Sequence, residues 1–169
     1  MNALCTIGYE GASIGDFIRT LNTAGVTTLL DVREIAISRK KGFSKTALKR
    51  ALEDAGIAYQ HEPKLGSPKA ARKQLKNNKD YNAFFHSYCN HLSTQATLLN
   101  ALSINLAGKV ALMCFEKDHT TCHRSKVAES IGEITGLTPV HLEVHHGRDP
   151  KQRTHTYSCE SISTTKPAL

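Results

Sequence analysis

Short apolar runs alternate with longer segments of helical period, and this pattern constrains the fold more than any other feature of the sequence. The runs have the length and β-branched content of buried strands, whereas the segments between them place apolar residues three and four positions apart. Alternating strands and helices are typical of βαβ units, in which helices cover a parallel sheet. The sequence therefore predicts an α/β fold: a single domain whose mainly parallel, open sheet is flanked by helices.

Helix-capping residues mark where several helices should begin. We expect helices to start at Ser13, Ser44 and Asp80, whose side chains can accept hydrogen bonds from free backbone N–H groups. We expect residues 1–142 to form the α/β domain and residues 143–169 to form a loosely structured basic C-terminal tail. The other predicted elements are strands at 4–8, 26–33, 57–61, 110–115 and 138–142, and helices at 69–75, 98–102 and 122–134.

Length and cysteine content favour a domain that needs no covalent crosslinks. A chain of 169 residues can bury a substantial core, and its five cysteines are odd in number and widely scattered. The N-terminus lacks the pattern of a secretory signal, and no apolar run approaches the ~20 residues that cross a bilayer. We therefore expect a cytoplasmic protein with reduced thiols and no membrane contact.

Positive charge is concentrated in one part of the chain. The formal net charge is +7, and the segment Arg33–Lys79 holds 13 Lys and Arg against 4 Asp and Glu. Such a segment predicts a phosphate-bearing partner, either a small molecule or a nucleic acid. The alternative is a solvated surface that only keeps the protein soluble.

Polar residues follow three of the predicted strands. The segments are Gly8–Gly11, Asp31–Glu34, and Cys114–Glu116, the last leading into Cys122–Arg124. The carboxyl ends of parallel strands meet at one edge of a sheet, where ligands bind in open α/β folds. The sequence therefore predicts a single site built from these segments.

Two interpretations of Asp31 stay open. A buried carboxylate needs a partner, and the guanidinium of Arg33 or Arg124 can bind it with two hydrogen bonds. Either this pair only fixes the loop, or one arginine binds a substrate phosphate or carboxylate while Asp31 orients it. Glu10 and Glu116 are a second pair of interest, because carboxylates that face one another can divide into an acid and a base.

The segment Cys122–Arg124 lies at the expected start of a helix, where the helix dipole favours anions. Either Cys122 or Cys114 is a nucleophile with a lowered pKa, or the helix N-terminus and Arg124 bind a phosphate. A zinc site built from Cys114, His119, Cys122 and His123 would lack the paired C-x-x-C spacing typical of structural zinc. We therefore predict no metal and no cofactor. The candidate catalytic residues are Glu116, His123, Asp31, Glu10 and Cys122, and the candidate ligand-binding residues are Tyr9, Gly8, Gly11, Arg33, Arg124 and Cys114.

Several of these motifs, in this order, resemble the Domain of Unknown Function 488 family. The motifs are Thr6–Gly11, Asp31-Val32-Arg33, Phe43 with its following helix, Gly56–Tyr59, Leu65-Gly66, and Cys114-Phe-Glu116-x-Asp118-x-x-x-Cys122-His123-Arg124. The resemblance implies an α/β domain with these motifs around one site, and it implies no settled reaction. Family members often have Pro-x-Ser-Arg and a second Gly where this chain has Ala36–Arg39 and Ser67. Both differences fall in loops beside the expected site.

Three hypotheses for function follow. The first is a protein that binds or processes a phosphate-bearing ligand, a nucleotide or nucleic acid, as a possible enzyme. The second is a non-catalytic nucleic-acid-binding module, although few aromatic residues lie in the basic segment to stack on bases. The third is a rhodanese-like, thiol-dependent transferase, which Glu116 disfavours because a carboxylate beside Cys114 would repel an anionic substrate.

Overall fold

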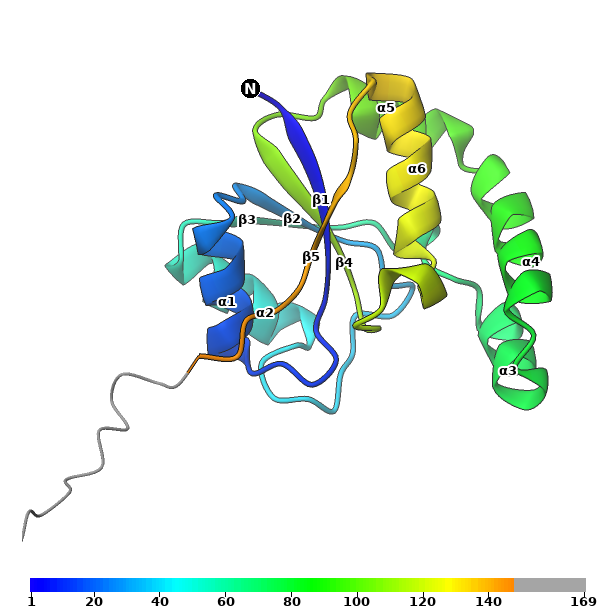
Figure 1. Cartoon of the computed structure of the whole chain (residues 1–169), viewed down its shortest axis with the longest axis horizontal. Coiled ribbons are helices and arrows are strands. Elements are labelled where there is room, and N and C mark those ends of the chain that lie inside the picture. The colour runs from blue at the N-terminus through cyan, green and yellow to red at the C-terminus, as the bar shows by residue number, and fades with distance from the viewer. Residues whose placement is uncertain (148–169) are drawn as a thin grey trace, which may run out of the picture.

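Five parallel strands form the sheet of the computed structural model, which describes residues 1–147 (Figure 1). Their order across the sheet is β3-β2-β4-β1-β5, and every neighbouring pair is parallel. This confirms the predicted α/β class and the open parallel sheet. The strands are β1 (Ala3–Gly8), β2 (Thr28–Asp31), β3 (Ala58–His61), β4 (Lys109–Cys114) and β5 (Val140–Leu142). The helices are α1 (Ile14–Thr23), α2 (Lys45–Asp54), α3 (Lys69–Asn78), α4 (Tyr81–Ser93), α5 (Ala96–Ile104) and α6 (Arg124–Thr135), with short 3-10 helices at Pro63–Leu65 and His119–Thr121.

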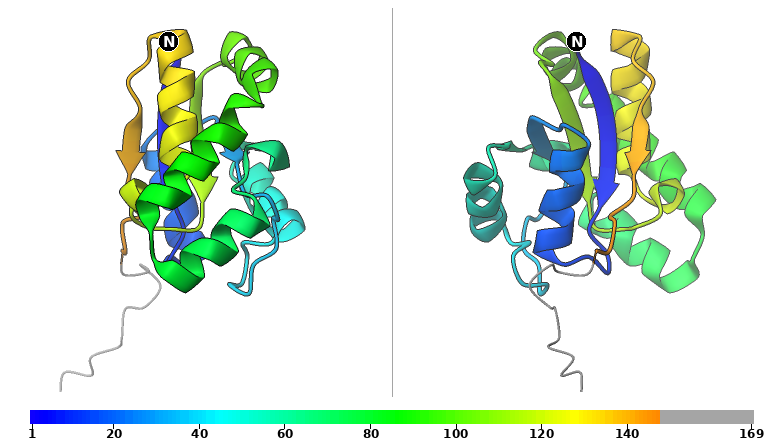
Figure 2. Two further views of the ribbon diagram at one scale, coloured as in Figure 1. Left: turned by 90° about the vertical axis from the view of Figure 1, so that its right-hand side faces the viewer. Right: turned by 60° about the vertical axis from the view of Figure 1, so that its left-hand side comes forward.

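The alternation of side chains along the strands divides the core into two layers. One face of the sheet packs on α1 and α2, where Ile7 and Met113 lie among Phe17 and Leu48. The other face packs on α4, α5 and α6. Figure 2 shows helices on both sides of the sheet. Because neither face of the central strands meets solvent, these strands read as continuous apolar runs in the sequence.

Two of the three predicted helix caps are confirmed. The Ser13 hydroxyl accepts from the backbone N–H of Asp16 (3.1 Å), and the Asp80 carboxylate accepts from the N–H of Ala83 (2.9 Å). Ser44 precedes α2, but its side chain forms no cap. Its hydroxyl donates instead to the carbonyl oxygen of Ser38 and accepts from the same residue's N–H. The predicted helix start at Ser44 is therefore confirmed, but the predicted side-chain cap is wrong, because the hydroxyl is used within the loop after β2.

The chain end described by the structure lies against α1. Residues 143–147 form no helix or strand, yet Val144 packs on the core and the N–H of His145 donates to the hydroxyl of Thr20 (3.1 Å). The remainder of the predicted tail lies outside the described residues. Within residues 1–147, none of the helices is both long and apolar enough to cross a bilayer.

Two glycines allow loops to meet at the carboxyl edge of the sheet. A Cβ atom on Gly8 would overlap the carbonyl oxygen of Glu116, and a Cβ atom on Gly66 would overlap the backbone N of Glu34. A side chain at either position would therefore push apart the loops that enclose this edge.

Replacement of Gly8 tests this close approach. We expect Gly8→Ala to lower the free energy of unfolding by about 2 kcal/mol, because the loop after β4 must move. The matched control is Gly15→Ala in α1, where only Ser13 Oγ lies as close as 4.0 Å to the added methyl group. This change should raise stability by about 0.5–1 kcal/mol through helix propensity. Urea unfolding measures both, and equal midpoints for Gly8→Ala and the wild type would contradict the prediction.

Candidate functional site

A cavity of about 740 Å³ opens at the carboxyl edge of the sheet. Its floor is formed by the end of β4 and the segment before α6, which contribute Cys114, Glu116 and His123. One wall is the loop after β2, and the opposite wall is α3 with the start of α4. The wall residues include Glu34, Ile35, Ile37, Ser38, Arg39, Ser67, Arg72, Lys76, Lys79, Tyr81 and Phe84.

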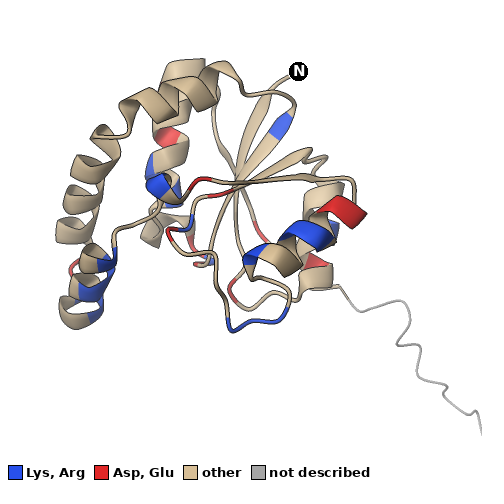
Figure 3. Cartoon of the chain, turned by 180° about the vertical axis from the view of Figure 1, so that it is seen from behind, with Lys and Arg blue, Asp and Glu red and all other residues tan. Residues whose placement is uncertain are grey.

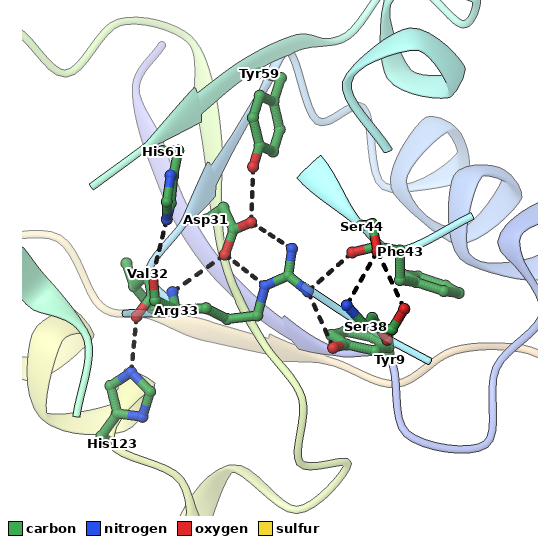
Figure 4. A network of polar contacts seen from close by, with 10 residues as sticks. All are labelled: Tyr9, Asp31, Val32, Arg33, Ser38, Phe43, Ser44, Tyr59, His61 and His123. Atoms are coloured by element: carbon green, nitrogen blue, oxygen red, sulfur yellow. Dashed lines mark hydrogen bonds and ion pairs between the residues drawn. The ribbon is translucent and has the colours of Figure 1, made fainter. Parts of the chain in front are cut away.

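A buried ion pair holds the loop after β2 in place (Figure 4). The Asp31 side chain has no solvent exposure, and its two oxygens accept from Arg33 Nε (2.8 Å) and Nη2 (2.6 Å). The Arg33 backbone N–H and the Tyr59 hydroxyl donate to the same carboxylate. All acceptor positions of Asp31 are therefore used within the protein.

The Nη1 donors of Arg33 also bind protein oxygens. Its Nη1 donates to the Tyr9 hydroxyl (3.0 Å) and to the carbonyl oxygen of Phe43 (2.9 Å). Burial lowers the pKa of Arg33, but Asp31 more than offsets this and the pKa is raised. Tyr9 stacks on Phe43 at 4.4 Å between ring centroids. Of the two open interpretations of Asp31 and Arg33, the geometry supports the one in which the pair fixes the loop.

Arg124 also binds protein groups. Its side chain is 1% exposed, and its guanidinium donates to the carbonyl oxygens of Glu116 and Lys117. The contact of Nε with the Thr6 hydroxyl is longer (3.4 Å). Arg124 therefore closes the loop between β4 and α6 over the end of β1, and it does not line the cavity.

The structure does not bring Glu10 and Glu116 together in the cavity. The Glu10 carboxylate accepts from the backbone N–H of Lys117 (3.0 Å) and so supports the loop from outside. Only Glu116 lines the cavity. Gly8 and Gly11 act through backbone shape, Gly8 by the close contact described above and Gly11 through its positive φ of 75°.

Four side chains form a cluster at the floor of the cavity. Cys114 Sγ lies 3.2 Å from Glu116 Oε2 and 3.7 Å from His123 Nδ1. Cys122 belongs to the same cluster. Its sulfur, the sulfur of Cys114 and a ring nitrogen of His123 all lie within 4.8 Å of one another. The His123 Nε2 atom lies 2.9 Å from the Val32 carbonyl oxygen. Because a carbonyl oxygen only accepts, Nε2 carries a proton and Nδ1 faces the sulfurs.

Burial sets the protonation of this cluster. It raises the pKa of Cys122 well above its usual value, and Cys114 adds to the effect. A Cys122 nucleophile was expected to have a lowered pKa, but these surroundings raise the pKa of Cys122 instead. Burial alone would raise the pKa of Glu116, but hydrogen bonds from Cys122 and Cys114 outweigh it and the pKa is lowered. Burial alone would lower the pKa of His123, yet its contacts with Cys122 and Val32 raise it.

Sequence reasoning missed one wall of the cavity. Arg72, Lys76 and Lys79 lie within the basic segment, but nothing in the sequence places them opposite the strand ends. Tyr81 and Phe84 follow that segment and supply aromatic surface that the segment itself lacks. An ion pair between Arg72 and Glu34 (2.6 Å) joins this wall to the loop after β2. The only sequence signal for this wall was the concentration of positive charge in the segment Arg33–Lys79. That signal did not indicate where the charges lie in the fold.

The chain is thus an α/β protein with a cavity at the carboxyl edge of its parallel sheet. A family model described as a domain of unknown function, DUF488, matches residues 13–131, and the chain belongs to this family. The match confirms the resemblance, although the segment Gly8–Gly11 precedes the matched range. Comparison with curated proteins gave no match. Comparison with solved structures gave none either.

Removal of one partner tests the buried ion pair. Asp31→Ala leaves the Arg33 guanidinium buried without its carboxylate, so we expect the free energy of unfolding to fall by about 3–5 kcal/mol. The matched control is Glu53→Ala, which breaks the exposed pair with Lys49 at 3.7 Å and should cost at most about 1 kcal/mol. Urea unfolding compares the two, and similar losses would show that Asp31 is not a structural anchor.

The lowered pKa of Glu116 predicts a pH-dependent contribution to stability. A carboxyl whose pKa is lower in the folded state stabilises the protein above its unfolded pKa, near 4.5, and loses this contribution as the pH falls through the folded pKa. Glu116→Gln lacks the titrating group. The stability difference between wild type and variant should therefore shrink as the pH decreases below 4.5.

Urea unfolding of both proteins between about pH 3 and pH 7 measures this difference. Glu129→Gln, the same change on the surface of α6, controls for the loss of a carboxylate in general. A difference that stays constant, or that grows toward acid pH, would contradict the prediction.

Proposed function

We propose that the protein binds a phosphate-bearing ligand of nucleotide size in the cavity at the carboxyl edge of the sheet. One observation carries the proposal: a single cavity has cationic side chains on its walls and a carboxylate, an imidazole and a thiol at its floor. Its volume lies within the usual range for small-molecule sites.

The free cations of the cavity come from the wall and not from the strand ends. Arg33 and Arg124 are occupied by protein groups, and Arg72 is paired with Glu34. Lys76 on α3, Lys79 directly after α3 and Arg39 on the loop after β2 are exposed and line the cavity. Figure 3 shows Lys and Arg along α3 and on the loop after β2. The phosphate is therefore expected against α3, where Lys side chains act as flexible point charges.

The floor of the cavity is suited to the end of the ligand that carries no phosphate. Glu116 has a lowered pKa and is an acceptor at neutral pH, so it disfavours phosphate and favours a hydroxyl or amino group. Tyr81, Phe84 and Phe115 line the cavity and can pack on a ring. The separation of charge orients the ligand, and it places Glu116 as the candidate proton acceptor with His123 beside it.

The backbone at Lys79 supports a role for this residue in binding. Lys79 ends α3 with φ = 57°, a left-handed conformation that glycine adopts without strain. A lysine there costs roughly 1–2 kcal/mol of backbone energy. Strained residues concentrate at functional sites, which is consistent with a charge that contributes to binding.

This conformation provides a variant that separates binding from folding. Lys79→Gly removes the charge and relieves the strain, so we expect higher stability together with about tenfold weaker binding of a nucleoside monophosphate. Lys76→Ala should weaken binding by a similar factor. Lys49→Ala on α2, on the other side of the sheet, is the control and should bind like the wild type.

Isothermal titration at two salt concentrations measures these affinities, since phosphate contacts weaken with salt. The unphosphorylated nucleoside should bind less tightly, and a short single-stranded oligonucleotide tests whether the phosphate comes from a nucleic acid. Equal affinity for nucleoside and nucleotide would overturn the proposal, and so would equal binding by Lys79→Gly and the wild type.

A further inference from the structure

Three potential metal-ligating atoms meet at the floor of the cavity. The sulfurs of Cys114 and Cys122 and the Nδ1 atom of His123 lie within 4.8 Å of one another, and all three residues are buried. Cys114 ends β4, whereas Cys122 and His123 stand directly before α6. The loop between them is held by Arg124, which bonds the carbonyl oxygens of Glu116 and Lys117.

The imidazole is oriented as a ligand. Its Nε2–H donates to the backbone carbonyl oxygen of Val32 (2.9 Å, Figure 4). This leaves Nδ1 on the side of Cys114 Sγ, at 3.7 Å. The Tyr88 ring packs edge-on against it at 5.1 Å between centroids. Histidines that bind metals commonly donate their second N–H to a backbone carbonyl, because this fixes the tautomer and the ring orientation.

The spacing of the ligand atoms fits a tetrahedral cation. A zinc ion lies ~2.3 Å from thiolate sulfur and ~2.0 Å from imidazole nitrogen, so two such ligands at the tetrahedral angle are about 3.5 Å apart. The distance between Cys114 Sγ and His123 Nδ1 is 3.7 Å. Binding would therefore require movements of only a few tenths of an ångström at this pair.

Glu116 lies directly beside this cluster. Its carboxylate is partly buried and lines the cavity, and Oε2 lies 3.2 Å from Cys114 Sγ. Among residues 1–147, no Lys, Arg or His side chain lies close enough to Glu116 to form an ion pair.

We propose that Cys114, Cys122 and His123 form a three-ligand site for Zn²⁺, with the fourth position open to the cavity beside Glu116. Two thiolates and a neutral imidazole match the ligand preference of this borderline-soft cation. On binding, the two thiols release their protons to solvent and the metal–ligand unit becomes neutral. Three protein ligands with one open position are typical of catalytic zinc sites. His119 is not part of the set, because its ring stacks on His141 at 3.5 Å between centroids.

The test uses the full chain, stripped of metal by a chelator and kept under a phosphine reductant. Zn²⁺ should bind with a stoichiometry of one, measured by competition with a chromogenic chelator. Co²⁺ should give the visible bands of tetrahedral coordination together with thiolate charge-transfer bands. Proton release, obtained from titration heats in buffers of different ionisation enthalpy, should approach two protons per metal.

Cys114→Ser and Cys122→Ser should each lower the Zn²⁺ affinity at least tenfold, with far-UV circular dichroism as the check on folding. Cys89→Ser on the exposed side of α4 is the matched control and should bind like the wild type. If a variant fails to fold, the wild-type Co²⁺ spectrum decides, because sulfur ligation can come only from cysteine or methionine. Absence of stoichiometric binding by the wild type, or a Co²⁺ spectrum without thiolate bands, would overturn the proposal.

The metal site and the phosphate site can fail separately. Lys79→Gly should bind Zn²⁺ like the wild type, whereas Cys122→Ser should lose the metal and keep the lysine wall. Loss of nucleotide binding in the first variant with normal metal binding would support both proposals. Nucleotide binding without any metal binding would leave the phosphate site and remove the zinc site.

Discussion

The buried contact between Asp31 and Arg33 is the interaction on which the rest of the site depends. The carboxylate ends β2 and also accepts from Tyr59 on β3, while the guanidinium reaches the Tyr9 hydroxyl after β1 and the Phe43 carbonyl before α2. One pair thus ties four separate segments together at the carboxyl edge of the sheet. Because both groups are enclosed, their hydrogen bonds are strong and their loss is costly.

The fold was predictable because its signals are local. The alternation of strands and helices and the capping residues Ser13 and Asp80 can each be recognised from a few neighbouring residues. Once the strands are known to be parallel, their carboxyl ends must meet at one edge of the sheet. The roles of Arg33 and Arg124 were not predictable in the same way. Whether a guanidinium binds a ligand or a protein carbonyl depends on which acceptors the fold brings to it, and the Phe43 and Glu116 carbonyls become neighbours only after folding.

Contacts that form only on folding also explain why the sequence did not place two features, the α3 wall and the cluster of Cys114, Cys122 and His123. Packing between helices brings the α3 wall opposite the strand ends. The charge composition of the sequence therefore predicts that cations are present but not where they lie in the fold. The cluster that we propose as a zinc site joins Cys114 to Cys122 across a loop of seven residues, which is longer than the spacing by which metal knuckles are recognised. The absence of a C-x-x-C pair led to the prediction of no metal. That inference does not extend to side chains that a folded loop brings together.

Buried arginines and exposed lysines have different roles at this edge of the sheet. Arg33 and Arg124 are buried, their donors are directed at protein oxygens, and they hold the loops around the cavity. Lys76 and Lys79 are exposed and keep their charge available to a ligand. This division explains how a cavity can have a cationic wall above a floor that contains the Glu116 carboxylate. Arg33 and Arg124 donate to protein oxygens other than the Glu116 carboxylate and form no ion pair with it, so this carboxylate keeps its negative charge in the cavity that Lys76 and Lys79 also line.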